Sequence, residues 1–208
     1  MFQLLGGYGA VIRQLLRTPE TMLTLGIMLV MSICTMVNST FWSIIVTQEI
    51  GVPAKTVGMF PLLRSSIMLV FFFVLVPRLK AVRFKNPLIT GFLAFIASQL
   101  LLILTPEKGW VVLIGSILLE ACALSLVNPL LDSMQVILVD QQERARIIAM
   151  MYLAVMALSS PFGWIAGVLS EVDHRLPFVL NIVLLSIGIV LTVFAAVSAS
   201  RKPIAADL

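Results

Sequence analysis

The chain has 208 residues, of which 60% are hydrophobic and only 12% are charged, and its mean hydropathy is +1.10. Soluble domains carry about 25% charged residues, and a soluble domain of this size could not hide so much apolar surface from water. The composition therefore excludes a soluble enzyme, a disordered segment and a nucleic-acid-binding module, despite a net charge of +4. It predicts an integral membrane protein that is embedded in the lipid bilayer and has the bilayer as a partner.

Taken in chain order, residues 1–20 predict a short cytoplasmic amphipathic segment, because a weak apolar pattern there alternates with arginines. Six segments then follow that are long and apolar enough to cross a bilayer as helices of about 20 residues. Loops rich in glycine, proline and charge separate them. The predicted spans within the bundle of residues 21–200 are about 22–47, 57–77, 87–105, 110–138, 144–170 and 176–199, and residues 201–208 form a cytoplasmic tail.

Lysine and arginine are distributed unequally between the two sides of this predicted membrane domain. With the N-terminus inside, ten of the 14 basic residues fall in cytoplasmic parts, three fall in outer loops, and Arg64 falls within a span. Cytoplasmic loops of membrane proteins carry such an excess. We therefore expect a multi-pass protein of the plasma (cytoplasmic) membrane with both termini in the cytoplasm.

Polar residues concentrate in the first and fourth spans, which predicts that these two helices wall a cavity. In span one they follow one helix face: Ser32, Thr35, Ser39, Ser43 and Thr47. In span four they fall within one half of the helix: Ser116, Glu120, Asn128, Asp132 and Gln135. Spans three and six are nearly all apolar and are expected to face lipid. Since the pattern recurs every three helices, we expect an all-α membrane protein built as two inverted three-helix repeats.

Two charged residues within the spans are the main candidates for function, because a charge at the bilayer centre costs about 2.5–3.5 kcal/mol on insertion scales. Arg64 lies roughly 10 Å and Glu120 roughly 15 Å below the outer edge, at 1.5 Å per helical residue. They can touch if their helices are neighbours. In one hypothesis Glu120 carries a proton while Arg64 holds an anionic substrate. In the other, a permanent ion pair only fixes the bundle.

The remaining candidates for the substrate pathway are polar side chains of spans one and four: Asn38, Asn128, Gln135, Ser39 and Ser43. Asp132 is expected to pair with Arg144, Arg146 or a basic residue of the loop between spans two and three. Such a pair is structural, or it is a gate if it forms in one conformation only. Trp42 is interpreted as an anchor at the membrane interface, and His174 as a solvated loop residue.

Enzymatic and metal-dependent functions find no support in the sequence. It holds one histidine and none of the zinc-protease, serine-hydrolase or P-loop motifs. Cys34 and Cys122 both lie in apolar segments, without the spacing of a metal site. We therefore expect no enzyme, no cofactor and no metal.

The order of these features resembles one half of a major facilitator superfamily transporter. Residues 77–85 form a basic loop between spans two and three, although without the glycine and aspartate of the family's best-known loop motif. Residues 140–146 look like the family's Glu-Arg-Gly-Arg-type linker, with Ala145 in place of glycine. The run from Ser159 to Gly163 is similar to its Gly/Pro-rich helix. The amphipathic opening resembles the linker before the second half, which indicates the C-terminal half.

The resemblance implies that six spans supply one of the two bundles between which this family holds its substrate. We therefore expect a half-size secondary transporter that moves a small molecule by alternating access. A homodimer or a separate partner half would complete it, and proton coupling through Glu120 is an added hypothesis. The alternative is a non-transporting membrane subunit, or a truncated transporter remnant, that binds a partner protein.

Overall fold

The computed structural model describes residues 19–75, 85–138 and 144–200, which form helices joined by short turns, with no strand among them. Six of these helices are long and apolar enough to cross a membrane, which fits a multi-pass membrane protein. In chain order the elements are α2 (Pro19–Ile44), η1 (Ile45–Glu49), α3 (Ala54–Val57), α4 (Met59–Leu75), α5 (Lys85–Ile103), α6 (Trp110–Leu138), α7 (Arg144–Val172) and α8 (Leu176–Ser200). The predicted N-terminal segment, except its last two residues, and the C-terminal tail lie outside the described residues.

The helix bounds follow the predicted spans closely, and α6 has the predicted bounds of 110–138. The main difference lies between the first two spans. Span one runs two residues beyond its predicted end, as the π-helix η1, and the one-turn helix α3 precedes α4. Since Pro53 caps the start of α3 and cannot donate a backbone hydrogen bond, the chain is redirected there rather than continued as one long helix.

The η1 segment is a wide turn at the end of α2. The backbone N–H of Ile50 donates to the carbonyl of Ile45, five residues back, at 3.2 Å. The next residue, Gly51, has φ of +77°, a backbone conformation that glycine adopts without steric cost. Single π-turns inside helices are rare and occur frequently at functional sites. The turn lies within eight residues of Trp42, a wall of the site described below.

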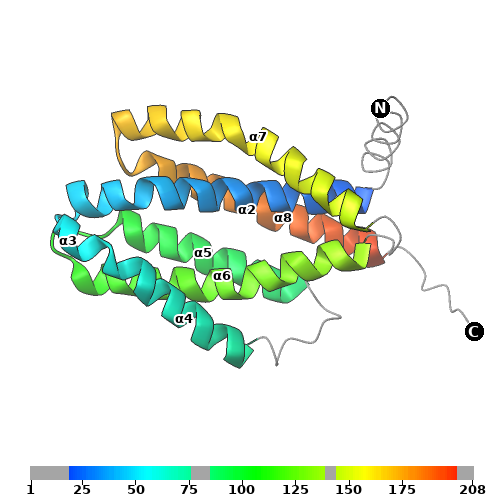
Figure 1. Cartoon of the computed structure of the whole chain (residues 1–208), viewed down its shortest axis with the longest axis horizontal. Coiled ribbons are helices and arrows are strands. Elements are labelled where there is room, and N and C mark those ends of the chain that lie inside the picture. The colour runs from blue at the N-terminus through cyan, green and yellow to red at the C-terminus, as the bar shows by residue number, and fades with distance from the viewer. Residues whose placement is uncertain (1–18, 76–84, 139–143, 201–208) are drawn as a thin grey trace, which may run out of the picture.

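The six long helices lie side by side, with α7 at one edge of the view and α4 at the opposite edge (Figure 1). Helix α2 packs against α8 and α7, α6 packs against α5 and α4, and α5 packs against α8. The start of α2 and the end of α8 lie at the same end of the bundle. We call the opposite end, which holds η1 and α3, the η1 end.

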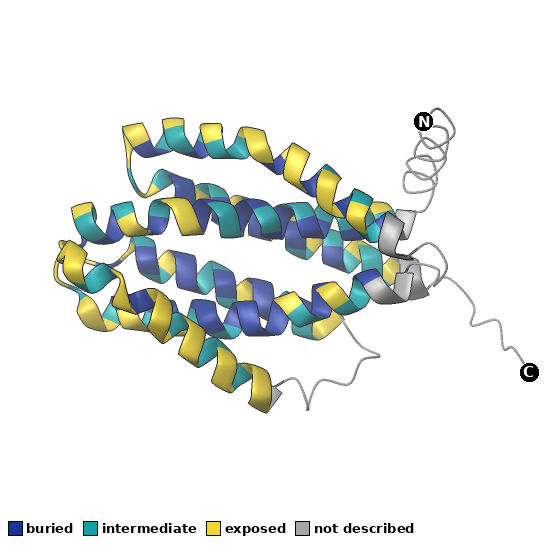
Figure 2. Cartoon of the chain, viewed as in Figure 1, coloured by how far each residue is buried: buried dark blue, intermediate teal, exposed yellow. Residues whose placement is uncertain are grey.

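The expectation that spans three and six are lipid-facing supports is wrong for one part of each helix, since 39% and 33% of their residues are buried against other helices. Helices α5 and α8 lie in the middle of the bundle, whereas α4 and α7 are the least buried of the six (Figure 2). The physical reason lies in their composition. A helix that is apolar all round can be packed on several sides, and apolarity alone does not distinguish a lipid neighbour from a helix neighbour.

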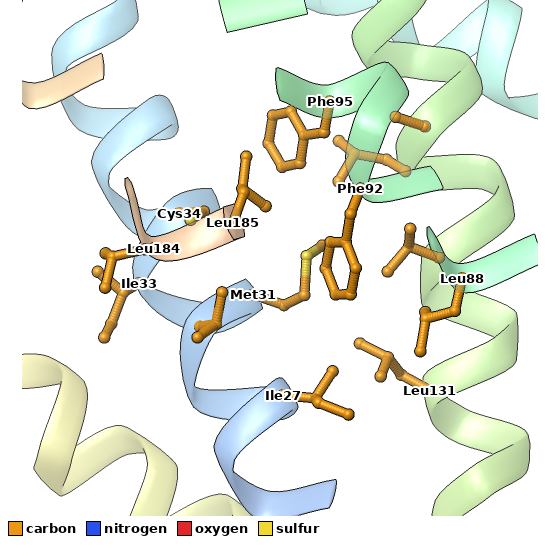
Figure 3. Packing of buried hydrophobic residues seen from close by; sticks show 14 of the residues in the cluster. Ile27, Met31, Ile33, Cys34, Leu88, Phe92, Phe95, Leu131, Leu184 and Leu185 are labelled. Carbon is orange, nitrogen blue, oxygen red and sulfur yellow. The ribbon is translucent and has the colours of Figure 1, made fainter. Parts of the chain in front are cut away.

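The core is formed where α2, α5, α6 and α8 meet, and side chains from these helices interdigitate there (Figure 3). Phe92 and Leu88 of α5 are fully buried against Ile27 of α2 and its neighbours. At Gly91 a Cβ atom would lie 2.4 Å from a methyl carbon of Val127, so α5 and α6 approach closely at this point. Inside a membrane, such van der Waals packing between helices replaces the hydrophobic effect as the stabilising interaction.

Polar contacts join the η1 segment to the turn between α7 and α8. His174 contacts the side chain of Gln48 through Nε2 and the carbonyl of Ser170 through Nδ1, at 2.9 Å for the latter. Beside it, Arg175 pairs with Glu49 at 3.5 Å. The interpretation of His174 as merely solvated is therefore wrong, because α2 and α7 are neighbours and their ends meet here.

Candidate functional site

Three helices bring one polar side chain each to the carboxylate of Glu120. Glu120 lies in α6 and is 1% exposed. Asn38 of α2 donates a hydrogen bond from Nδ2 to its Oε1 at 2.5 Å. Arg64 of α4 donates from Nη1 to the same oxygen and forms an ion pair with it. The structure thus joins the two charged residues whose similar depths predicted contact, and adds Asn38 as a third member.

The Arg64–Glu120 pair is electrically neutral as a unit, which explains how a carboxylate can lie buried among apolar helices. An unpaired buried ion costs several kcal/mol in desolvation, and the attraction of a hydrogen-bonded counterion offsets this cost. The Arg64 side chain is 30% exposed, whereas that of Glu120 is 2% exposed. The guanidinium is therefore the accessible side of the pair.

A hollow of about 230 Å³ opens beside the pair. Its lining combines the charged pair with apolar and aromatic side chains: Asn38, Ser39, Trp42, Phe60, Pro61, Arg64, Ile117 and Glu120. Trp42 and Phe60 meet edge to face with ring centroids 5.6 Å apart, and Trp110 lies 6.4 Å beyond Phe60. Since a water molecule takes about 30 Å³ of the liquid, the hollow has room for about eight waters or one small molecule.

Two polar atoms of the residues that line this hollow are buried without a hydrogen-bond partner among the described residues. They are the acceptor Oδ1 of Asn38 and the donor Nε1 of Trp42. Leaving such a group unpaired costs about 1–3 kcal/mol, and native proteins hold few of them. Both atoms belong to side chains that line the hollow, so these two side chains hold hydrogen-bonding capacity that the described residues do not use.

Of the other predicted pathway residues, only Ser39 lines the hollow. Ser43 is exposed on α2 outside the lining, and Gln135 is buried about 22 Å along α6 from Glu120, at 1.5 Å per residue. Asn128 and Asp132 border a second hollow of about 760 Å³ between α4 and α6. The structure therefore places Ser39 at the first hollow, Asn128 at the second, and Ser43 and Gln135 at neither.

The predicted gate falls partly outside the described residues. Asp132 is exposed at the wall of the second hollow. The side chains of Arg144 and Arg146, and the basic loop of residues 76–84, are not described, so the predicted pairing of Asp132 stays a prediction.

The hydroxyl groups along α2 mostly bond to their own helix. Thr35 donates to the carbonyl of Met31 at 2.8 Å, Ser39 to that of Met36 at 2.9 Å, and Thr47 to that of Ser43 at 2.8 Å. Such back-bonding satisfies a hydroxyl group in an apolar surrounding. These three hydroxyls are thus satisfied within α2 and η1, and Asn38 is the α2 side chain that bonds to Glu120.

Sequence reasoning missed the aromatic wall of the site. Trp42, interpreted as an interface anchor, is 9% exposed and packs against Phe60 instead. A signal was present, because Trp42 follows Asn38 by four residues and therefore shares its helix face. The contact with Phe60, in contrast, depends on how α4 is placed against α2, which the sequence pattern does not show.

A second buried polar cluster was also underestimated, because its residues looked like minor exceptions in apolar spans. Asn181 of α8 donates from Nδ2 to the carbonyl of Cys34 at 3.4 Å and to Oε1 of Gln99 at 3.5 Å. All three side chains are fully buried. The cluster links α2, α5 and α8 at the centre of the bundle, away from the hollow, and its position indicates a packing role.

No family model, curated protein or solved structure matches this chain. Within the described residues, no group of three or more histidine, cysteine, aspartate or glutamate side chains is placed to hold a metal ion. The apolar helices, their packing and the hollow beside Glu120 are therefore the features that indicate a function.

Proposed function

We propose that this chain is one half of a secondary transporter that moves a small molecule across the membrane by alternating access. The observation that carries the proposal is the Asn38–Glu120–Arg64 cluster beside a hollow within apolar helices. Ionisable residues inside membrane spans are costly and commonly belong to substrate or proton pathways. An interaction built only to hold helices together would not need a hollow with unpaired polar atoms beside it.

The packing of the helices supports an inverted repeat, which is the common architecture of such transporters. In such a repeat α2 corresponds to α6, α4 to α7, and α5 to α8. The contact between α2 and α8 then corresponds to that between α6 and α5, and the contact between α2 and α7 to that between α6 and α4, and all four contacts are present. The α5–α8 contact maps onto itself. Since the triplets contain three crossings each, the second would enter the membrane from the opposite side. The excess of basic residues favours cytoplasmic termini in the plasma membrane.

In the proposed mechanism the Arg64–Glu120 pair is the element that changes state. Glu120 takes and releases a proton, while Arg64, the more exposed partner, contacts the substrate. Neutralising Glu120 would release Arg64 from its counterion, so proton movement and substrate binding would be coupled. The chain acts as a transporter without enzymatic chemistry or a cofactor.

A second wall is needed to complete the pathway. Ser39, Ser43, Asn128 and Asp132 all lie on exposed parts of α2 and α6, and polar side chains facing lipid are unfavourable. We propose that a second six-helix bundle covers them, either another copy of this chain or a separate partner half. This arrangement corresponds to the two bundles implied by the resemblance to the major facilitator superfamily.

The alternative function is a non-transporting subunit or transporter remnant that binds a partner protein. The observation favouring it is the low burial of α4, which leaves large apolar side chains such as Leu62 and Phe73 about 70% exposed. A permanent partner protein on α4 would account for this surface without any movement of the bundle.

The two functions can be distinguished without knowing the substrate, by testing whether a water-soluble reagent reaches position 39 from one side of the membrane or from both. Ser39→Cys would be introduced after replacing Cys34 and Cys122 by alanine, and sealed vesicles of both orientations would be treated with a membrane-impermeant thiol reagent. A transporter predicts labelling from both sides. Val190→Cys, exposed on α8 and expected to face lipid, is the control that should stay unlabelled. Labelling of Ser39→Cys from one side only, or from neither, would refute alternating access.

A further inference from the structure

Building on the proposed function, we infer that the hollow beside Glu120 takes a small zwitterion: a molecule with a carboxylate and an ammonium group close together on a short apolar body. An α-amino acid with a branched or aromatic side chain has this chemistry. The inference rests on the charge of the site, its unpaired polar atoms and its size.

Charge balance is the first argument. Arg64 and Glu120 are the charged residues of the lining and together carry no net charge. A ligand with a net charge would leave that charge uncompensated in a poorly solvated site, and such a charge costs several kcal/mol. A zwitterion adds two opposite charges and keeps the site neutral. While Glu120 is ionised and paired with Arg64, the site therefore disfavours phosphates, simple carboxylates and simple amines.

The unpaired donors match a carboxylate. A guanidinium carries five N–H donors in a planar fork, and carboxylates bind such a fork bidentately. In the structure Nη1 of Arg64 is the atom bound to Glu120, which leaves donors on the other nitrogens. Nε1 of Trp42 is a further buried donor in the lining without a partner among the described residues. A simple amine offers no acceptor to either group.

The unpaired acceptors match an ammonium group. Oδ1 of Asn38 is buried and unpaired within the described part of the chain. Both hydrogen bonds that Glu120 receives fall on Oε1, so Oε2 is able to accept a further donor. An ammonium group has three donors, enough for both oxygens. A simple carboxylate has no donor for them.

The size and the remaining walls define the body of the ligand. A volume of about 230 Å³ accommodates a single small molecule, smaller than the contents of the 300–1,000 Å³ pockets that hold drug-sized ligands. Phe60, Pro61 and Ile117 supply apolar lining. The charged groups therefore belong at one end of the ligand, and a compact apolar side chain belongs at the other.

The test compares three probes that share one carbon skeleton. L-leucine carries both charged groups, 3-methylbutylamine lacks the carboxylate, and 4-methylpentanoate lacks the ammonium group. Binding to the full chain in nanodiscs would be measured by isothermal titration calorimetry. We expect leucine to bind at least tenfold more tightly than either analogue. Equal binding of 4-methylpentanoate, or absence of leucine binding at millimolar concentration, would overturn the inference.

Variants show whether the binding takes place in this hollow. Glu120→Gln and Trp42→Phe should each weaken leucine binding, the first at least tenfold, because they remove an acceptor charge and a donor respectively. The second variant keeps the test decisive if the first does not fold. Ser186→Ala is the matched control, since Ser186 is exposed on α8 and bonds to its own helix. Unchanged leucine binding in both site variants would place it elsewhere and overturn the inference.

The inference and the proposed function fail in different ways. Selective leucine binding together with one-sided labelling of Ser39→Cys would support the zwitterion site and refute transport. Two-sided labelling together with equal binding of the three probes would support transport and refute the zwitterion.

Discussion

Replacing Arg64 by leucine would remove one partner of the buried ion pair while retaining much of the apolar stem. Glu120 would then keep only its hydrogen bond from Asn38. Removing one partner of a buried pair costs about 3–5 kcal/mol, because the other charge is left uncompensated. Since the Arg64 side chain is 30% exposed and Asn38 remains, we expect the lower end of that range, about 3 kcal/mol, in the free energy of unfolding.

The double variant Arg64→Leu/Glu120→Leu should recover most of this loss. Replacing a whole buried ion pair by apolar side chains is often neutral or stabilising, and here only the Asn38 amide would lose its partner. We therefore expect the double variant to lose about 1 kcal/mol in the free energy of unfolding, the lower end of the cost of leaving one buried group unpaired. The coupling energy between the two positions should be at least about 2 kcal/mol, within the range for contacting residues.

Four proteins measure this coupling: the unchanged chain, the two single variants and the double variant. Each would be unfolded reversibly with SDS in lipid bicelles while helix content is followed by circular dichroism. If the two single effects add to within about 0.5 kcal/mol, as for distant independent sites, then the charged pair does not form in the membrane. That result would refute the site described above.

Three further predictions concern packing and the η1 end. Gly91→Ala should destabilise the bundle by about 1–3 kcal/mol through overpacking, whereas Gly115→Ala, with open space around it, should leave the SDS unfolding midpoint unchanged. Asn181→Leu should lower the free energy of unfolding by about 1–3 kcal/mol because it leaves the buried Gln99 amide unpaired. Adding Gln99→Leu should restore part of that loss in the same assay. A double variant that is less stable than Asn181→Leu alone would contradict the pairing. Arg175→Ala should change the midpoint little, since an exposed ion pair such as Arg175–Glu49 contributes about 0–1 kcal/mol to stability. A shift as large as that of Gly91→Ala would contradict this expectation.

Much of the fold could be predicted from the sequence because a lipid environment leaves the chain few choices. Every backbone group in a span must be paired within the segment, so a long apolar run is a helix and its ends lie close to the next charge or proline. For the same reason the depths of Arg64 and Glu120 could be counted from the span edges. Their contact followed from one assumption, that α4 and α6 are neighbours.

What could not be predicted depends on how the helices are rotated and which ones are neighbours. Lipid tails are as apolar as a protein core, so the pattern of a helix such as α5 or α8 does not show which side meets lipid. Trp42 was misplaced for a related reason, since an aromatic residue near the end of a span suits the interface as well as a contact with Phe60. Asn181 and Gln99 each looked like an isolated polar exception in an apolar span, because the sequence does not show that their side chains bond to each other.

The wide turn at η1 has a consequence for how the chain tolerates changes in length. A π-turn accommodates one residue more than an α-helical turn does. Deleting a residue between Ile45 and Glu49 would let this turn close as ordinary α-helix, with both flanking segments kept in place. Deleting a residue in α2 between Asn38 and Trp42 would rotate Trp42 by about 100° about the helix axis relative to Asn38. Only one of the two side chains could then still face the site of Glu120. Length variation in this part of the molecule is therefore expected to be confined to η1.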